Sequence, residues 1–171
     1  RCAGLLAIPS HNRMIQSIVS GGQTGVDRAA LDTALKLEIP CGGWCPKDRR
    51  AEDGVLDVMY PLLETPLQRY SQRTEWNVRD SDGTLVLYQE FLTGGSAYTV
   101  ELAKKYERPL LVLDLSTNPA QETVREWINQ CHVYIVNIAG PRESTSPGIY
   151  QATCMWLSRA LSWEKLPGRK I

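Results

Sequence analysis

The stretch Ser20–Asp27, which reads SGGQTGVD, follows the apolar run Ile15–Val19 and opens a helical pattern over Val26–Glu38. A glycine-rich turn between a strand and a helix presents free backbone N–H groups and the positive end of the helix dipole, so it favours an anion, most often phosphate. We predict that Asp27 caps this helix. The alternative is a tight turn that serves packing only. The predicted anion cradle consists of Gly21, Gly22, Gln23, Thr24 and Gly25.

Strands and helices alternate along the rest of the chain. Apolar runs typical of buried parallel strands lie at Ile15–Val19, Ile39–Trp44, Thr84–Tyr88, Pro109–Leu113 and Val133–Ile138. Helical patterns lie at Val26–Glu38, Pro66–Arg79, Ser96–Glu107, Ala120–Asn129 and Gly148–Trp163. This alternation predicts a single α/β domain, a parallel sheet of about five or more strands with helices on both faces. Right-handed crossovers then bring every strand-to-helix turn to one edge of the sheet. Residues 1–13 are predicted to form an irregular lead-in, and residues 14–171 the domain.

Two further turns resemble the first. Leu92–Ser96 supplies a second candidate cradle, made of Gly94, Gly95 and Ser96, with Thr99 one helical turn further on. If the turns lie at the same edge of one sheet, they form one pocket, which is where folds of this class bind ligands.

The third turn, Ala139–Ser144, contains Gly140, Arg142, Glu143 and Ser144. Arg142 suits a phosphate or another oxyanion, and Glu143 suits the N–H donors of a heterocycle. The alternative is an ion pair across a surface loop.

The loop Trp44–Gly54 carries a cluster of basic residues followed by acidic ones. Lys47, Arg49 and Arg50 are candidates to close over an anion. The alternative is an ordinary solvated loop.

Composition narrows the function classes. The 171 residues include 19 Lys and Arg and 19 Asp and Glu, so the net charge of zero argues against nucleic acid or a membrane surface as partner. No apolar run approaches the roughly 20 residues of a membrane span, and Cys2–Pro9 is too short for a secretory signal. The five cysteines form no evident disulfide framework, which favours a reducing compartment. We therefore expect a cytoplasmic protein.

Several catalytic and metal signatures are missing from the sequence. The first turn lacks the Gly-Lys-Ser/Thr of a P-loop and the spacing of the dinucleotide fingerprint, and no Gly-x-Ser-x-Gly elbow occurs. Cys41 and Cys45 have no second ligand pair for zinc. We therefore predict neither catalytic residues nor a metal site. Cys131 and Cys154 are predicted to be small core residues. Arg73 and Glu75 are predicted to form an exposed pair.

In combination, these motifs resemble the molybdenum-cofactor carrier proteins. The resemblance runs from about Ile15 to Leu161 and rests on an ordered series of motifs: 20-SGGQTGVDRAALD-32, 42-GGWCPK-47, 51-AEDG-54, 60-YPL-62, 73-RTEWNV-78, 80-DSDGT-84 and 139-AGPRESTSPGIY-150. This family looks like a permuted relative of the lysine-decarboxylase-like, LOG-type proteins.

The resemblance implies a Rossmann-like homodimer or homotetramer that binds the molybdenum cofactor, protects it and delivers it without catalysis, with molybdoenzymes as recipients. The cofactor carries a phosphate monoester, a pterin ring and an anionic oxo-molybdenum group. These fit the predicted cradles and the side chains of Lys47, Arg49 and Arg142. Molybdate or another oxyanion is an alternative cargo.

The resemblance to LOG-type proteins also leaves two alternatives open: a nucleotide-binding protein, or a nucleoside-monophosphate phosphoribohydrolase with Glu101 or Glu143 as acid or base. LOG-type hydrolases carry Pro-Gly-Gly-x-Gly-Thr-x-x-Glu. The nearest stretch here, Thr93–Glu101, keeps the paired glycines but lacks the third glycine and spaces its acidic residue differently.

Overall fold

A five-stranded parallel sheet forms the centre of the protein, in a computed structural model that describes residues 15–92 and 94–165. The strand order is β2-β1-β9-β7-β8. The bounds are Ser17–Val19 for β1, Cys41–Gly42 for β2, Gly83–Tyr88 for β7, Leu110–Asp114 for β8 and Ile135–Ala139 for β9. The predicted parallel α/β fold, Rossmann-like and single-domain, is confirmed. The lead-in predicted for residues 1–13 lies outside the described residues.

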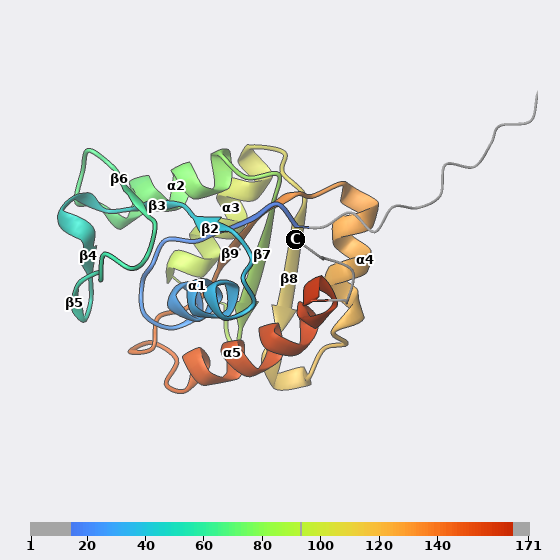
Figure 1. Ribbon diagram of the computed structural model, residues 1–171. Coiled ribbons are helices and arrows are strands. Elements are labelled where there is room, and N and C mark those ends of the chain that lie inside the picture. The colour runs from blue at the N-terminus through green and yellow to red at the C-terminus, as the bar shows by residue number, and fades with distance from the viewer. Residues whose placement is uncertain (1–14, 93, 166–171) are drawn as a thin grey trace, which may run out of the picture.

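Helices cover both faces of the sheet (Figure 1). On one face, α1 (Val26–Lys36), α4 (Glu122–Cys131) and α5 (Ile149–Ala160) pack on β1, β7 and β9 around the main hydrophobic core. On the other, α2 (Tyr70–Arg79) and α3 (Gly94–Lys105) enclose a smaller cluster. Short 3₁₀ turns, η2 (Leu115–Thr117) and η3 (Ser162–Lys165), follow β8 and α5. None of the described helices is long and apolar enough to cross a membrane.

A small lobe between β2 and α2 replaces the predicted irregular loop. It contains β3 (Trp44–Cys45), η1 (Lys47–Arg49), the antiparallel pair β4 (Arg50–Ala51) and β5 (Gly54–Val55), and β6 (Leu63–Glu64), which pairs with β3. Its apolar side chains pack against Leu31 of α1. The lobe lies at the left of Figure 1, beside the end of the sheet formed by β2.

Several predicted boundaries need correction. The strand expected over Ile39–Trp44 is divided between β2 and β3, because Gly43 has a φ of 127° that breaks the extended backbone. The helix expected from Pro66 begins at Tyr70, since Arg69 is extended.

The prediction that Cys131 is a core residue is wrong, because Cys131 is exposed at the end of α4. Cys154, also predicted in the core, is half-buried. Trp156 of α5 lies in the main hydrophobic core, and Trp163 packs against this core.

The parallel register positions the functional edge. Ile18 of β1 pairs with Val136 of β9, and Val86 of β7 pairs with Ala139 at the end of β9. The carboxyl ends of β1, β7 and β9 therefore lie side by side, and so do the turns that follow them.

Candidate functional site

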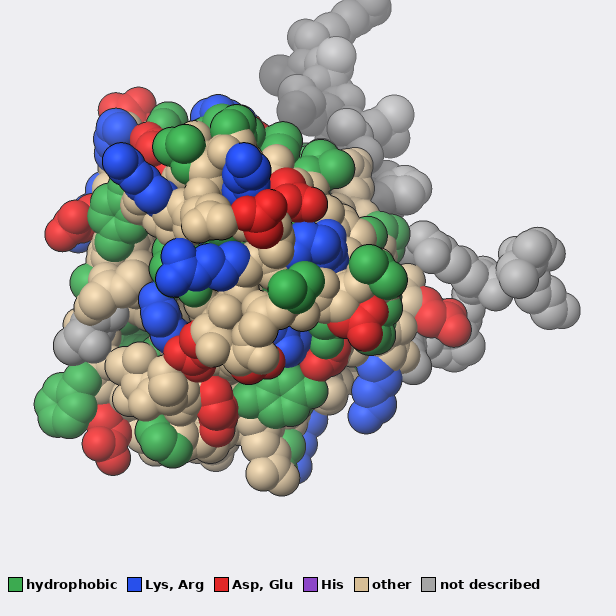
Figure 2. Space-filling model, turned by 90° about the vertical axis from the view of Figure 1, so that its left-hand side faces the viewer, with side chains coloured by type: hydrophobic (Ala, Val, Ile, Leu, Met, Phe, Trp, Pro, Cys, Tyr) green, Lys and Arg blue, Asp and Glu red, His purple; other side chains and the backbone are tan. Residues whose placement is uncertain are grey.

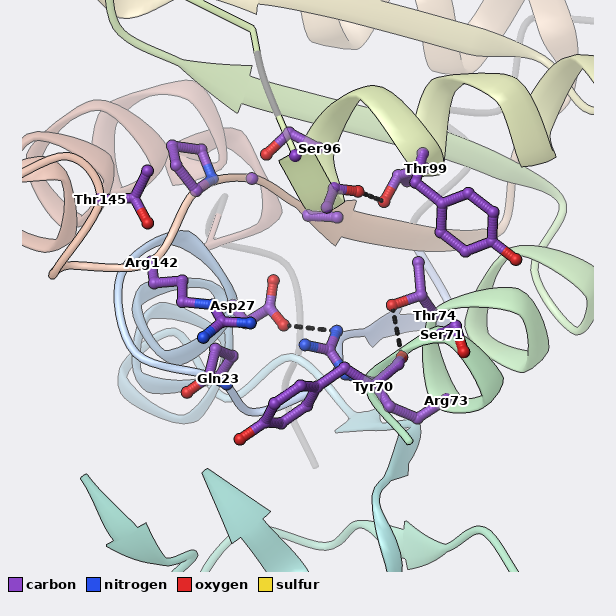
Figure 3. A pocket seen from close by; sticks show the side chains of 16 residues that line it. Gln23, Asp27, Tyr70, Ser71, Arg73, Thr74, Ser96, Thr99, Arg142 and Thr145 are labelled. Carbon is purple, nitrogen blue, oxygen red and sulfur yellow. Dashed lines mark hydrogen bonds and ion pairs between the residues drawn. The ribbon is translucent and has the colours of Figure 1, made fainter. Parts of the chain in front are cut away.

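A cavity of about 390 Å³ lies where the turns after β1, β7 and β9 meet, and we call it the central pocket. Helix α2 forms the remaining wall (Figure 3). The lining residues are Gln23, Asp27, Tyr70, Ser71, Arg73, Thr74, Gly94, Gly95, Ser96, Tyr98, Thr99, Ala139, Gly140, Pro141, Arg142 and Thr145. The size falls within the range of small-molecule sites.

Buried polar atoms without partners are concentrated at this pocket. Within residues 15–92 and 94–165, four buried side-chain polar atoms lack a hydrogen-bond partner, and three belong to lining residues: Gln23 Nε2, Arg73 Nε and Ser96 Oγ. Leaving such a group unsatisfied costs about 1–3 kcal/mol. A polar ligand that pairs with these donors would recover that free energy.

Gln23 is held in a fixed orientation. Its Oε1 accepts hydrogen bonds from the backbone N–H groups of Thr24, at 3.1 Å, and Glu52, at 2.9 Å. The carbonyl end of the side chain is therefore engaged, and the NH₂ end keeps its donors for a ligand.

A buried ion pair forms one wall of the pocket. Arg73 Nη1 donates to Asp27 Oδ2 at 2.9 Å, and both side chains are buried. Burial raises the pKa of the Asp27 carboxyl above its ordinary value, although the Arg73 guanidinium opposes the shift. The helix-cap prediction for Asp27 and the exposed-pair prediction for Arg73 are both wrong, since α1 has Gly25 at its cap and α2 turns Arg73 inward.

Three arginines surround the ring of Tyr70 at the mouth of the pocket. The guanidinium carbons of Arg142, Arg50 and Arg73 lie 4.9, 5.2 and 5.9 Å from the ring centroid. Figure 2 shows basic side chains gathered in the middle of the face that includes the small lobe, with acidic side chains beside them. Arg73 is paired with Asp27, and Arg142 Nη1 lies 3.8 Å from Glu52 Oε2, so the charges of these two guanidinium groups are partly neutralised. Their remaining N–H donors suit an anionic ligand.

The glycines of the first turn are packed against the protein itself, although Thr24 and Gly25 also line a separate cavity of about 480 Å³. A Cβ on Gly21 would lie 2.1 Å from Arg73 Nη1, and one on Gly25 would lie 2.3 Å from the Pro141 carbonyl oxygen. That carbonyl also accepts the Val26 N–H, at 3.2 Å, and Gly22 faces Leu56 and Leu62. Only Gln23, of the five residues in the predicted cradle, lines the central pocket.

The second turn is open. A Cβ built on Gly94 or Gly95 would meet no atom within 4 Å, and both glycines line the central pocket. They begin α3, whose first backbone N–H groups have no partner within the helix. Ser96 Oγ is unpartnered there, whereas the Thr99 hydroxyl donates to the Gly95 carbonyl at 2.9 Å. Thr93 lies outside the described residues.

The third turn contributes one basic side chain to the pocket, and its other polar side chains form hydrogen bonds within the protein. Gly140 and Arg142 line the pocket. The Glu143 carboxylate instead accepts the N–H groups of Gly148, at 2.5 Å, and Tyr150, at 3.0 Å, at the start of α5. Ser144 Oγ donates to Glu52, at 2.5 Å.

Glu52, in the β4–β5 hairpin, connects this turn to the first one. Its carboxylate accepts hydrogen bonds from the hydroxyls of Thr24 and Ser144 and from the Ser144 N–H. Burial favours a raised pKa for Glu52, but these hydrogen bonds outweigh it and hold the pKa below its ordinary value. The small lobe is thus fixed to both turns.

Two basic residues predicted to close over an anion lie elsewhere. The Arg49 guanidinium donates to four backbone carbonyls of the small lobe, those of Leu56, Asp57, Tyr60 and Leu62. Lys47 is exposed in η1 and does not line the central pocket. Arg50, from the same loop, is the one beside Tyr70.

Sequence reasoning missed the contribution of α2, which supplies Tyr70, Ser71, Arg73 and Thr74 to the pocket. The available signal was the motif 73-RTEWNV-78, one of those that carried the family resemblance. Within the described ranges, no group of three or more His, Cys, Asp or Glu residues is arranged to hold a metal ion.

Comparison with known proteins identifies the family. A model of the circularly permuted YpsA SLOG family matches residues 18–161. The chain belongs to this family. A crystal structure from Syntrophus aciditrophicus SB, at 1.45 Å resolution and named "Putative molybdenum carrier protein", is 47% identical, covers 87% of this chain and 96% of its own, and superposes with a TM-score of 0.82. No curated protein matches the chain. The suspected family is therefore confirmed.

Proposed function

We propose that the central pocket binds the molybdenum cofactor as cargo, and that the protein protects and delivers it without catalysing a reaction. The observation that carries this proposal is the set of unpartnered buried donors of Gln23, Arg73 and Ser96 around one cavity. The name of the 47% identical neighbour, which refers to molybdenum, supports the choice of ligand.

The cofactor's two ends suit different walls of the pocket. Its phosphate matches the open start of α3 at Gly94–Ser96, together with the Arg142 guanidinium. Its pterin edge presents N–H donors beside a carbonyl acceptor, and these match the Asp27 carboxylate and the Gln23 NH₂ group.

The test is gel filtration after anaerobic incubation with molybdenum cofactor, followed by pterin and molybdenum assay of the protein peak. We expect stoichiometric co-elution of both with the native protein. Ser96→Ala removes a donor from the pocket, and we expect it to weaken binding about tenfold, or about 1.4 kcal/mol. Thr153→Val is the matched control, because Thr153 Oγ1 is also buried and unpartnered but does not line the pocket.

The outcomes separate the hypotheses. Molybdenum without pterin would indicate an oxyanion site. A protein peak that contains neither molybdenum nor pterin would contradict the carrier function. Equal losses of binding affinity in Ser96→Ala and Thr153→Val would contradict it as well. The predicted homodimer or homotetramer, and transfer to molybdoenzymes, remain predictions that light scattering and reconstitution of an apo-enzyme would test.

A phosphoribohydrolase is the second candidate, and one observation favours it: a buried carboxyl with a raised pKa, Asp27, lies beside Arg73 in the pocket. The acids first considered are less suitable, because Glu143 caps α5 and Glu101 does not line the pocket. Release of adenine from AMP by the native protein, abolished in Asp27→Asn, would support hydrolysis. No release during long incubation at high protein concentration would exclude it for this substrate.

A further inference from the structure

Glu52 lies outside the central pocket, yet its main chain and its side chain both bind residues of the turns that build the pocket. It stands at the tip of the hairpin between β4 and β5, in the small lobe. Because Glu52 does not line the cavity, any effect that it has on a ligand there must pass through residues that do.

The main chain of Glu52 fixes the direction of the Gln23 side-chain amide. Gln23 is buried, and its Oε1 accepts the N–H groups of Glu52, at 2.9 Å, and of Thr24, at 3.1 Å. The two ends of a glutamine amide have nearly the same shape, but only the oxygen accepts such bonds. The NH₂ end, whose Nε2 is buried and unpartnered, is therefore the end that is left for a ligand in the pocket.

The side chain of Glu52 connects the two residues whose N–H groups hold that amide. Its carboxylate accepts the hydroxyl of Thr24 from the first turn, and the hydroxyl and N–H of Ser144 from the third. The Thr24 hydroxyl in turn accepts the Glu143 N–H, at 3.2 Å. One network of hydrogen bonds thus holds the hairpin, both turns and the Gln23 amide in register.

A donor that is fixed before a ligand arrives costs less to order when the ligand binds. A free glutamine side chain samples several rotamers and both amide orientations, and a ligand that holds it must remove this freedom. In Gln23 the two bonds to Oε1 have already removed it. The fixed orientation also selects the ligand, because an NH₂ group pairs with an acceptor and leaves a donor without a partner.

We propose that Glu52 is a positioning residue of the central pocket, which orients the Gln23 amide so that its NH₂ group donates to an acceptor atom of the ligand. This inference rests on the proposed function, in which that acceptor is the carbonyl oxygen of the pterin ring. Glu52 thereby contributes to the affinity of the pocket without touching the ligand.

The experiment is a double-mutant cycle, in which anaerobic equilibrium dialysis measures the affinity of the purified full chain for molybdenum cofactor. We expect Glu52→Gln to weaken binding about tenfold more in the native background than in a Gln23→Ala background, which has lost the amide. Any effect that passes through Arg142, 3.8 Å from the Glu52 carboxylate, appears in both backgrounds and cancels. Glu64→Gln, in the same lobe, is the control and should leave the affinity unchanged.

A second readout needs no ligand. The Gln23 NH₂ group gives its own signals in nitrogen–proton correlation spectra, which are identified by their loss in Gln23→Ala. We expect these signals to move toward those of exposed glutamines in Glu52→Gln and to stay in place in Glu64→Gln. The hairpin should remain folded in Glu52→Gln, because the neighbouring Asp53 carboxylate binds Arg28 of α1 through two hydrogen bonds of 3.1 Å.

Equal losses of affinity in the two backgrounds would overturn the inference and leave the carrier function intact. Gln23 signals that do not move in Glu52→Gln would overturn it as well. If the native protein does not bind the cofactor, the proposed function fails together with the role of Glu52 in affinity, and the Gln23 signals still decide whether Glu52 orients the amide.

Discussion

The turn at Ser20–Val26 and the turn at Gly94–Ser96 have similar sequences and opposite roles. Both follow a strand of the sheet and open a helix with paired glycines. In the first, the Pro141 carbonyl accepts the Val26 N–H and the glycines have no room for a Cβ. In the second, a Cβ on either glycine would meet no atom within 4 Å, and Ser96 Oγ is unpartnered.

The difference shows that a glycine-rich turn has two distinct physical uses. Glycine at the first turn allows protein atoms to approach closely, so that the turn serves as scaffold and contributes only the Gln23 side chain to the pocket. Glycine at the second turn leaves the backbone uncovered, and a ligand can approach instead. The pattern alone did not separate these uses, because the neighbours of each turn come from distant parts of the chain.

The largest effect that tests the scaffold role of the first turn is expected from Arg73→Met. Arg73 fills the space beside Gly21 and pairs with buried Asp27, so its loss leaves an uncompensated buried carboxylate. We expect the free energy of unfolding, measured in urea, to fall by about 3–5 kcal/mol. Glu75→Gln, on the same helix, removes an exposed pair with Lys105 and should cost at most about 1 kcal/mol. Similar losses in the two variants would contradict the assignment of the first turn as scaffold.

A direct test of the comparison sets Gly25→Ala against Gly95→Ala. Gly25 has a φ of 78° and abuts the Pro141 carbonyl, so alanine there should cost about 1–3 kcal/mol in backbone strain alone. Gly95 lies within α3 with open space around it, and alanine should stabilise the protein by about 0.5–1 kcal/mol. Thermal and urea unfolding measure both effects. Destabilisation by both substitutions would mean that the second turn is also a packed scaffold.

The fold was predictable because its signals are local. Apolar runs such as Thr84–Tyr88 and the helical patterns between them fix the parallel sheet, and crossover handedness fixes the edge at which the turns meet. The site was only partly predictable. Gln23, Ser96 and Arg142 line the pocket as members of glycine-rich turns that the sequence displays.

The roles of the remaining residues depend on how the backbone folds around them. Arg49 looks like a free cation in the sequence, but the small lobe folds four carbonyls around it. Glu143 looks like a ligand acceptor, but the start of α5 supplies it with two N–H donors. Arg73 looks exposed, but Asp27, 46 residues away, draws it inward. The partners of Arg49 and Glu143 lie only 5 to 13 residues along the chain, but they are backbone groups that any residue type carries, so the sequence does not mark them. Only the Arg73–Asp27 pair joins distant parts of the sequence.

The smallest expected effect concerns the attachment of the small lobe by Glu52, which joins the first turn to the third. Its pKa lies below the ordinary value of 4.5, because hydrogen bonds from Ser144 and Thr24 outweigh the effect of burial. A carboxyl with a lowered pKa stabilises the fold fully above its unfolded pKa, and this contribution is lost as the pH falls through the folded pKa. Glu52→Gln should therefore cost about 1 kcal/mol near neutral pH, and the difference from the native protein should shrink as the pH falls below about 4.5.

Urea unfolding of the two proteins across this pH range measures the effect. Glu64→Gln is the control, because Glu64 lies in the same lobe but accepts a hydrogen bond from Asp48 rather than from either turn. If the difference between Glu52→Gln and the native protein stays constant with pH, the ionised carboxylate does not stabilise the attachment. If this difference shrinks as the pH falls, protonation of Glu52 weakens the attachment of the small lobe to the first turn.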